Sequence, residues 1–351
     1  MSNKMIAVMK TKPEVGAELR EIPIPEPGPK DLLVKVRATS ICGTDVHIYK
    51  WEGVFTKRIK PPMVFGHEFC GDVVKVGRDV TGFKEGDYVS AESHIPCTVC
   101  PVCRNNQMHI CHNLKILGVD TVGCFSNFCL VPEICAWKND PSLPTELACI
   151  QEPVGNAVYT VLAEPITGKS VVVIGDGPAG CNMVGVARAS GAGRIWQVGK
   201  YPFRLNIGKQ MGADVSINIK EPGTEVVKRI VAETAGIGVD VVLDTVGNQE
   251  AVNWALGCVR KGGRISAFGI PSAPITIDYA SGIVFKGARL LGINGRLMYD
   301  TWFQMAGLLA SKKFDPTPII THRIKLSEFE KGFAAMTSDN RTAGKVVMYP
   351  D

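Results

Sequence analysis

Residues 171–180 read VVVIGDGPAG, and this stretch decides the fold of the middle of the chain. Four apolar residues in a row are typical of a strand buried on both faces of a parallel sheet. The next six have the spacing G-x-G-x-x-G, which permits a tight turn, a close approach of phosphate to the backbone and close packing of a helix. That helix, predicted over residues 179–190, offers free N–H groups to phosphates. The residues expected to contact a dinucleotide here are Gly175, Gly177, Pro178, Ala179 and Gly180.

The end of the second predicted strand bears on which dinucleotide binds. This strand ends at Val198 and is followed by Gly199, where a site for NAD normally has an Asp or Glu that binds both ribose hydroxyls. Gly199 brings no carboxylate that would repel a 2′-phosphate, and Lys200 and Arg204 can pair with one. The sequence therefore predicts NADP as the cofactor, with NAD as the alternative.

The pattern of predicted secondary structure changes near residue 155. Before it, short β runs separated by Gly, Pro and Asp predict a partly open, barrel-like β domain over residues 1–155. After it, strand-like and helix-like segments alternate, which predicts a doubly wound parallel sheet in a Rossmann domain over residues 156–293. Residues 294–351, with a helix near 301–310, are expected to return to the first domain.

Four cysteines lie close together within residues 94–115. Their spacing, C-x2-C-x2-C-x7-C, suits a closed tetrahedral zinc site, and an iron–sulfur cluster is the alternative. The ligands would be Cys97, Cys100, Cys103 and Cys111. The neighbouring His109 and His112 are expected to face solvent, because four sulfurs already complete the coordination shell. Seven further cysteines have no such spacing and are predicted to be small buried hydrophobic residues: Cys70, Cys124, Cys129, Cys135, Cys149, Cys181 and Cys258.

A second group of metal-binding side chains is centred on the stretch Gly66-His67-Glu68. His67 offers an imidazole nitrogen and Glu68 a carboxylate, and both are good ligands for Zn²⁺. Cys42, 25 residues before His67, would supply a thiolate. The alternative for the His-Glu pair alone is a surface histidine beside an acid.

Composition excludes several other classes of protein. The chain has 351 residues and a net charge of +5, with Lys and Arg scattered, so no nucleic-acid partner is expected. The apolar runs are too short to span a bilayer, and the first ten residues do not resemble an export signal. With 12 cysteines and no export signal, reduced thiols in the cytoplasm are expected.

Over essentially its whole length the sequence resembles the zinc-dependent medium-chain dehydrogenases, most closely their L-threonine 3-dehydrogenase group. The resemblance is carried by residues 41–49, 62–68, 155–158, 318–323 and 344–347. It implies a GroES-like catalytic domain interrupted by a Rossmann domain, an alcohol or ketone substrate and a homotetramer. Glu152 in place of Asp, and the absence of an acid at Gly199, depart from the common threonine dehydrogenase pattern.

The resemblance also implies roles for individual residues. The catalytic zinc would be held by Cys42, His67 and Glu68, with Glu152 as a further acid at or beside the metal. Thr44 and His47 match a proton-relay pair. Because a second carboxylate would make the zinc site anionic, we expect Glu68 or Glu152 to exchange with water. The positions that match cofactor contacts are Ala179, Gly199, Arg204, Phe268, Gly269, Ile270, Ile293 and Asn294.

These observations predict a zinc-dependent oxidoreductase with two Zn²⁺ per chain, one catalytic and one structural. It would move a hydride between a secondary alcohol, such as an L-threonine-like hydroxy compound, and the nicotinamide of NADP. The alternatives are a polyol or sugar-alcohol dehydrogenase, or a ketone reductase, of the same fold. A non-catalytic dinucleotide-binding protein is the alternative from another class.

Overall fold

The computed structural model describes residues 3–351, which form two compact units. The first unit contains residues 3–153, 320–339 and 345–351, and the second contains residues 154–319 and 340–344. Residues 294–319 were expected in the first domain but pack with the second unit. Arg296 illustrates the reason: it is buried, and its Nη1 donates to Oδ1 of Asn156 at 2.7 Å. No helix within residues 3–351 is long and apolar enough to cross a membrane.

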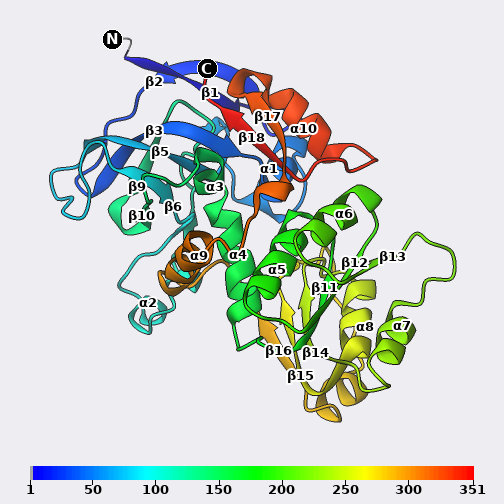
Figure 1. Ribbon diagram of the computed structural model, residues 1–351. Coiled ribbons are helices and arrows are strands. Elements are labelled where there is room, and N and C mark those ends of the chain that lie inside the picture. The colour runs from blue at the N-terminus through cyan, green and yellow to red at the C-terminus, as the bar shows by residue number, and fades with distance from the viewer. Residues whose placement is uncertain (1–2) are drawn as a thin grey trace. The chain divides into compact units, whose positions relative to one another are not determined.

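The first unit is mostly β, as its short apolar runs predicted (Figure 1). Its strands are β1 (Lys4–Lys10), β2 (Glu18–Pro23), β3 (Asp31–Ser40), β4 (Met63–Val64), β5 (Glu68–Val76), β6 (Tyr88–Ala91), β7 (His94–Ile95), β8 (Lys115–Ile116), β9 (Phe128–Pro132), β10 (Ala136–Lys138), β17 (Ile320–Lys325) and β18 (Lys345–Tyr349). The largest sheet has the order β10-β6-β5-β3-β18-β17, with β9 also paired to β3. Smaller sheets have the orders β2-β1-β4 and β7-β8.

Short helices fill the connections of the first unit. They are α1 (Gly43–Lys50), η1 (Val54–Lys57), α2 (Pro101–Arg104), η2 (Met108–Ile110), η3 (Glu133–Cys135), α3 (Thr145–Cys149), η6 (Leu326–Glu328) and α10 (Phe329–Thr337). The antiparallel pair β3–β5 matters most for function, because its register places Ser40 opposite Glu68 and so brings the segment after β3 beside the start of β5.

The second unit is built on a six-stranded sheet of order β13-β12-β11-β14-β15-β16, with every pairing parallel. Its strands are β11 (Ser170–Ile174), β12 (Arg194–Gly199), β13 (Val215–Asn218), β14 (Val239–Asp244), β15 (Val259–Ala267) and β16 (Arg289–Gly292). Its helices are α5 (Pro178–Ala189), α6 (Pro202–Gln210), α7 (Val226–Glu233), α8 (Gln249–Cys258), η4 (Ala280–Val284), α9 (Asp300–Ala310) and η5 (Thr317–Ile319). Helix α4 (Gln151–Leu162) begins in the first unit and ends in the second.

The sheet of the second unit is covered by helices on both faces, with α5 and α6 on one side and α7 and α8 on the other (Figure 1). Its apolar core includes Val172, Trp196 and Val242. This is the doubly wound sheet that the alternating strand-like and helix-like segments after residue 155 predicted. Strand order reverses between β11 and β14, and ligands of such sheets bind outside the carboxyl ends of the strands at that point.

Candidate active site

The structure brings Cys42, His67 and Glu68 together in the first unit. Cys42 is the residue before α1, His67 is the residue before β5, and Glu68 is the first residue of β5. One ligand atom from each of the three lies within 4.8 Å of the others. A thiolate, an imidazole and a carboxylate at this spacing fit one Zn²⁺ and leave room for a further ligand.

Asp45, which the sequence analysis missed, lies behind His67. It is fully buried, and its Oδ1 is 3.5 Å from Nδ1 of His67. Its Oδ2 accepts the backbone N–H of Cys42 at 2.8 Å. Burial lowers the pKa of His67, but the charges of Asp45 and Cys42 outweigh it, and the pKa lies well above its usual value. A carboxylate behind a ligating histidine orients the ring toward a metal, so Asp45 supports both candidate ligands.

Glu68 already has a cationic partner, which sequence reasoning also missed. Both of its oxygens accept from Nζ of Lys345, and one accepts from Oγ of Ser40. The side chains of Lys345 and Glu68 are 4% and 0% exposed, and Nζ also donates to the carbonyl of Ile41 at 3.2 Å. Burial raises the pKa of Glu68, and Lys345 opposes that rise. The only signal in the sequence was a lysine at the start of the apolar run that forms β18.

Glu152, the further acid implied by the resemblance, lies near these residues but outside the group of three. It is buried, and its Oε1 accepts from Oγ of Ser93 at 2.6 Å. It is close enough to raise the pKa of Glu68, after the larger effects of burial, Lys345 and His67. A small shift of either carboxylate would therefore change how many acids face the metal position.

Thr44 and His47, the predicted relay pair, both lie on α1 and are three residues apart, so they face the same side of the helix. Thr44 is partly buried, while the His47 side chain is 51% exposed. Nδ1 of His47 lies 3.3 Å from Oε1 of Glu52, a partner that the sequence did not suggest. A partly buried hydroxyl followed by an exposed imidazole is suited to passing a proton to solvent.

His47→Asn should slow alcohol oxidation by about 10²-fold or more without removing zinc, because a general acid–base group is lost and no metal ligand is. Steady-state kinetics and metal content, measured together, test this. His322→Asn is the control, since His322 lies in β17 and bonds to Thr321 (2.8 Å). Loss of a zinc equivalent in His47→Asn would place that histidine among the ligands instead.

The four cysteines of the predicted structural site also converge. One sulfur from each lies within 4.8 Å of the others. Backbone N–H groups donate to the sulfurs. The N–H of Cys97 lies 3.3 Å from Sγ of Cys111, and the N–H of Cys103 lies 3.5 Å from Sγ of Cys100. N–H groups of Val99 and Cys100 lower the pKa of Cys97 to about 6. Four sulfurs this close fit a single tetrahedral cation.

Two predictions about the residues around this cluster have different outcomes. His112 is exposed as expected, but His109 is buried, so its prediction as a solvent-facing residue is wrong. The carbonyl of His109 lies 3.0 Å from Nδ1 of His94, which lies in β7 just before the cluster, and this contact holds the segment inward. The other seven cysteines are buried, as predicted.

The glycine turn of the second unit fits a dinucleotide. A Cβ on Gly180 would lie 2.2 Å from the carbonyl oxygen of Gly175, so only glycine lets α5 pack this close to β11. A Cβ on Gly177 would meet nothing within 4 Å, so this backbone is open to a phosphate. Pro178 is the first residue of α5 and Ala179 the second, which places both at the helix end that favours anions.

At the end of β12 the structure corrects the premise of the NADP prediction. A carboxylate is present after all: Asp176, from the glycine turn, accepts the backbone N–H groups of Lys200 and Tyr201, each at 2.7 Å. Arg204, expected to pair with a 2′-phosphate, is buried and donates through Nε and Nη2 to the carbonyl of Ala343 at 2.9 and 2.7 Å. Of the predicted phosphate partners, Lys200 has an exposed side chain.

The remaining predicted cofactor contacts follow the carboxyl ends of β15 and β16. Asp244, which sequence reasoning missed, holds the backbone of the loops at this edge of the sheet by hydrogen bonds. Its backbone carbonyl accepts N–H from Phe268 and Gly269 at 2.9 Å, and its side chain accepts from the loop after β14. Ile270 is exposed, Ile293 is buried and Asn294 is exposed. All of these residues lie on the same edge of the sheet as the glycine turn.

This fold and these side chains define a class of protein, and comparison with known proteins agrees. The chain belongs to the zinc-dependent alcohol dehydrogenase family: the alcohol dehydrogenase GroES-like domain matches residues 28–141, and the zinc-binding dehydrogenase domain matches residues 178–311. It is therefore an oxidoreductase that uses zinc and a nicotinamide cofactor to transfer a hydride to or from an alcohol carbon.

Within that family the chain is similar to L-threonine 3-dehydrogenases. The enzyme of Pyrococcus horikoshii is 47% identical over 348 residues, which cover 99% of each chain. Two solved structures are also similar. A zinc-binding dehydrogenase of Sinorhizobium meliloti 1021 bound to NADP has a TM-score of 0.91 and 28% identity, over 99% of this chain and 100% of that one. The alcohol dehydrogenase TADH of Thermus sp. ATN1 has a TM-score of 0.89 and 31% identity, over the same shares. The predicted family and fold class are confirmed.

Proposed function

We propose that the protein oxidises the secondary hydroxyl at C3 of L-threonine to a ketone. The observation that carries the proposal is the group Cys42, His67 and Glu68, held within 4.8 Å in a chain 47% identical to an L-threonine 3-dehydrogenase along its length. Glu152 in place of Asp is a conservative change at a buried carboxylate, so it does not argue against threonine.

The candidate site residues of the first unit have separate roles in this reaction. Cys42, His67 and Glu68, with Glu152 beside them, would hold a catalytic zinc, which supplies a Lewis acid that lowers the pKa of the alcohol. Thr44 accepts the hydroxyl proton and passes it toward His47, which releases it to solvent. Asp45 keeps His67 oriented throughout. A nicotinamide cofactor bound at the glycine turn would supply the acceptor for the hydride from C3, so the two electrons lost by the alcohol carbon would go to the cofactor.

We propose two zinc ions per chain, the second at Cys97, Cys100, Cys103 and Cys111. The clustered thiolates need a cation to balance their charge, and a structural zinc contributes directly to folding. For the dinucleotide we propose NAD, in place of the NADP that Gly199 suggested, because Asp176 puts a carboxylate where the sequence predicted none. The bound NADP of the Sinorhizobium meliloti structure belongs to that protein, 28% identical to this one.

A substrate screen tests the proposed function. The holoenzyme is assayed with L-threonine, D-threonine, a 2,3-diol, a sugar alcohol and a simple ketone, each with NAD(H) and NADP(H). We expect kcat/KM for L-threonine to exceed that for each other compound by at least about tenfold, because buried polar groups built for one substrate reject analogues that leave them unpaired. Turnover of the sugar alcohol with none of L-threonine would establish the polyol alternative.

We also propose a homotetramer located in the cytoplasm. Support for assembly comes from β16, an edge strand in its sheet, and from the exposed apolar residues just before and within it: Tyr279, Val284, Phe285 and Leu290. Support for the cytoplasm comes from all 12 cysteines being free thiols. Sedimentation equilibrium should give four times the chain mass of 37.9 kDa, and Leu290→Arg should reduce it. A monomeric wild type would refute the assembly.

A further inference from the structure

The end of β12 and the glycine turn have complementary side chains. Gly199 has none, and Asp176 fills the space: a Cβ built on Gly199 would lie 2.5 Å from Cβ of Asp176 and 2.7 Å from its Oδ2. These distances are shorter than any real carbon contact, so residue 199 has to be glycine while Asp176 stays in place. The carboxylate that related sites carry at the strand end comes here from the turn before the helix.

Asp176 is held in this position by two backbone donors. Its Oδ2 accepts the N–H groups of both Lys200 and Tyr201 at 2.7 Å, and the residue is 8% exposed. These are the first two N–H groups after β12, at the edge where a dinucleotide's adenosine ribose binds in this fold. Within residues 3–351, Oδ1 of Asp176 accepts no hydrogen bond, so this oxygen can accept one from a ribose hydroxyl.

Two of the cations near this edge, Arg204 and Lys220, have other partners, while the side chain of Lys200 is exposed. The Arg204 guanidinium donates twice to the carbonyl of Ala343. Nζ of Lys220 lies over the ring of Tyr201, 4.5 Å from its centre. A 2′-phosphate would therefore meet the negative charge of Asp176 and find the two nearest N–H groups already occupied.

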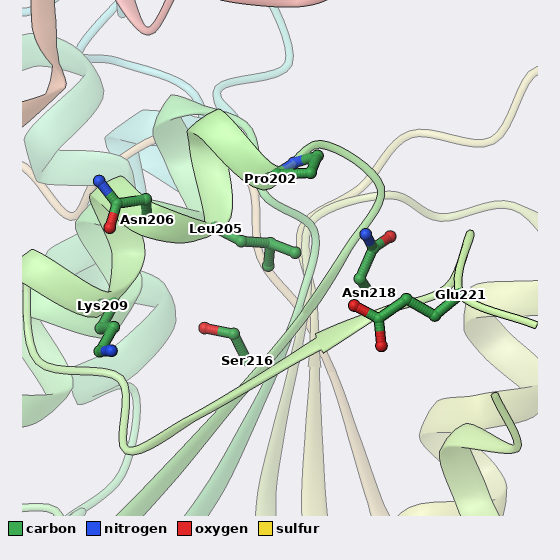
Figure 2. A pocket seen from close by; sticks show the side chains of 7 residues that line it. All are labelled: Pro202, Leu205, Asn206, Lys209, Ser216, Asn218 and Glu221. Carbon is green, nitrogen blue, oxygen red and sulfur yellow. The ribbon is translucent and has the colours of Figure 1, made fainter.

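A hollow of about 260 Å³ lies beside this edge but is a separate feature (Figure 2). Pro202, which follows Tyr201, is at its rim, and the remaining lining comes from α6, β13 and Glu221. Asp176 does not line it. The hollow contains both Lys209 and Glu221, whose opposite charges give no preference for an added phosphate.

We infer that Asp176 is the residue that selects NAD over NADP, by accepting hydrogen bonds from the ribose hydroxyls and repelling a 2′-phosphate. The inference rests on the proposed function only in requiring that a nicotinamide dinucleotide bind along this edge. It assigns cofactor choice to the second position of the glycine motif, and it explains the glycine at position 199 as room for that side chain.

Asp176→Asn tests the inference, because asparagine keeps an oxygen for the N–H groups of Lys200 and Tyr201 and loses only the charge. NADH and NADPH are titrated into the zinc-loaded protein, and binding is followed by nicotinamide fluorescence. We expect the wild type to bind NADH at least about tenfold more tightly than NADPH, and the variant to lose at least about tenfold of that ratio, as the loss of a charged group at a binding site implies. Glu225→Gln, which removes an exposed acid paired with Lys228, should leave the ratio unchanged.

Moving the carboxylate gives a second test. Gly199→Asp alone should weaken binding of both cofactors, since the new side chain overlaps Asp176. Asp176→Ala combined with Gly199→Asp should restore the preference for NADH. A wild type that prefers NADPH, or an Asp176→Asn variant with an unchanged ratio, would overturn the inference and leave the threonine proposal intact. Cofactor binding with the expected ratio but no turnover of L-threonine would overturn the threonine proposal alone.

Discussion

Cys42→Ser should leave a folded protein that has lost about one equivalent of zinc and nearly all of its dehydrogenase activity. Serine stays protonated near neutral pH, so the site loses the thiolate among its three clustered ligands. Loss of the Lewis acid removes several kcal/mol of stabilisation of the developing alkoxide, which corresponds to about 10³-fold or more in rate. Metal analysis and steady-state kinetics on the same preparation measure both effects.

The matched control is Cys100→Ser, which changes the same atom at the other sulfur cluster. It should also lose about one equivalent of zinc, but its main effect should be on folding, seen as a lower thermal midpoint and poorer recovery of soluble protein. A fully active Cys42→Ser enzyme would contradict the catalytic zinc site. Equal loss of thermal stability in both variants would mean that the two metals do not have separate roles.

Lys345→Met should lower the free energy of unfolding by about 3–5 kcal/mol, because removing one partner of a buried ion pair leaves the other charge uncompensated. The pair is unusually enclosed, with side chains 4% and 0% exposed. Methionine has a similar length and lacks the charge, so lost packing contributes little. Equilibrium unfolding in urea, at fixed protein and zinc concentrations, measures the change.

The double variant Lys345→Met/Glu68→Gln separates charge from shape. Removing the carboxylate charge as well should recover most of the stability that the single variant loses, since no buried ion then lacks a partner. Activity should not recover with it, because Glu68 is a proposed zinc ligand. A loss below about 1 kcal/mol in Lys345→Met would show that the charge of Glu68 is balanced by other groups.

The sequence predicted those parts of the fold and site that depend on residues close together in the chain. The glycine turn and the strand before it are one continuous stretch, and the four sulfur ligands lie within 15 residues of one another. The spacing of apolar residues then predicted the parallel sheet, because buried parallel strands are apolar on both faces. Family resemblance added Thr44, His47 and Glu152, which no local pattern indicates.

Residues brought together by the fold could not be predicted in this way. Lys345 meets Glu68 across 277 residues of sequence, and nothing near either residue indicates the other. Asp176 reaches the end of β12 across 24 residues, so the residues at the strand end gave no indication of a carboxylate there. The domain boundary at residue 294 also differed, because a buried arginine that binds back to α4 has no signature in the sequence.

The place of β18 in the large sheet has a consequence for biosynthesis. This strand lies between β3 and β17, yet it is the last strand of that sheet to be synthesised. The six strands of the second unit, all within residues 170–292, are complete earlier and need only local βαβ connections. Synthesis proceeds at about 5–20 residues per second. The sheet of the second unit is therefore expected to form while the large sheet of the first unit still lacks β18 between β3 and β17. Until β18 fills that gap, the acid beside the metal position has no counter-ion, and the nascent chain exposes an unpaired edge that a chaperone can recognise.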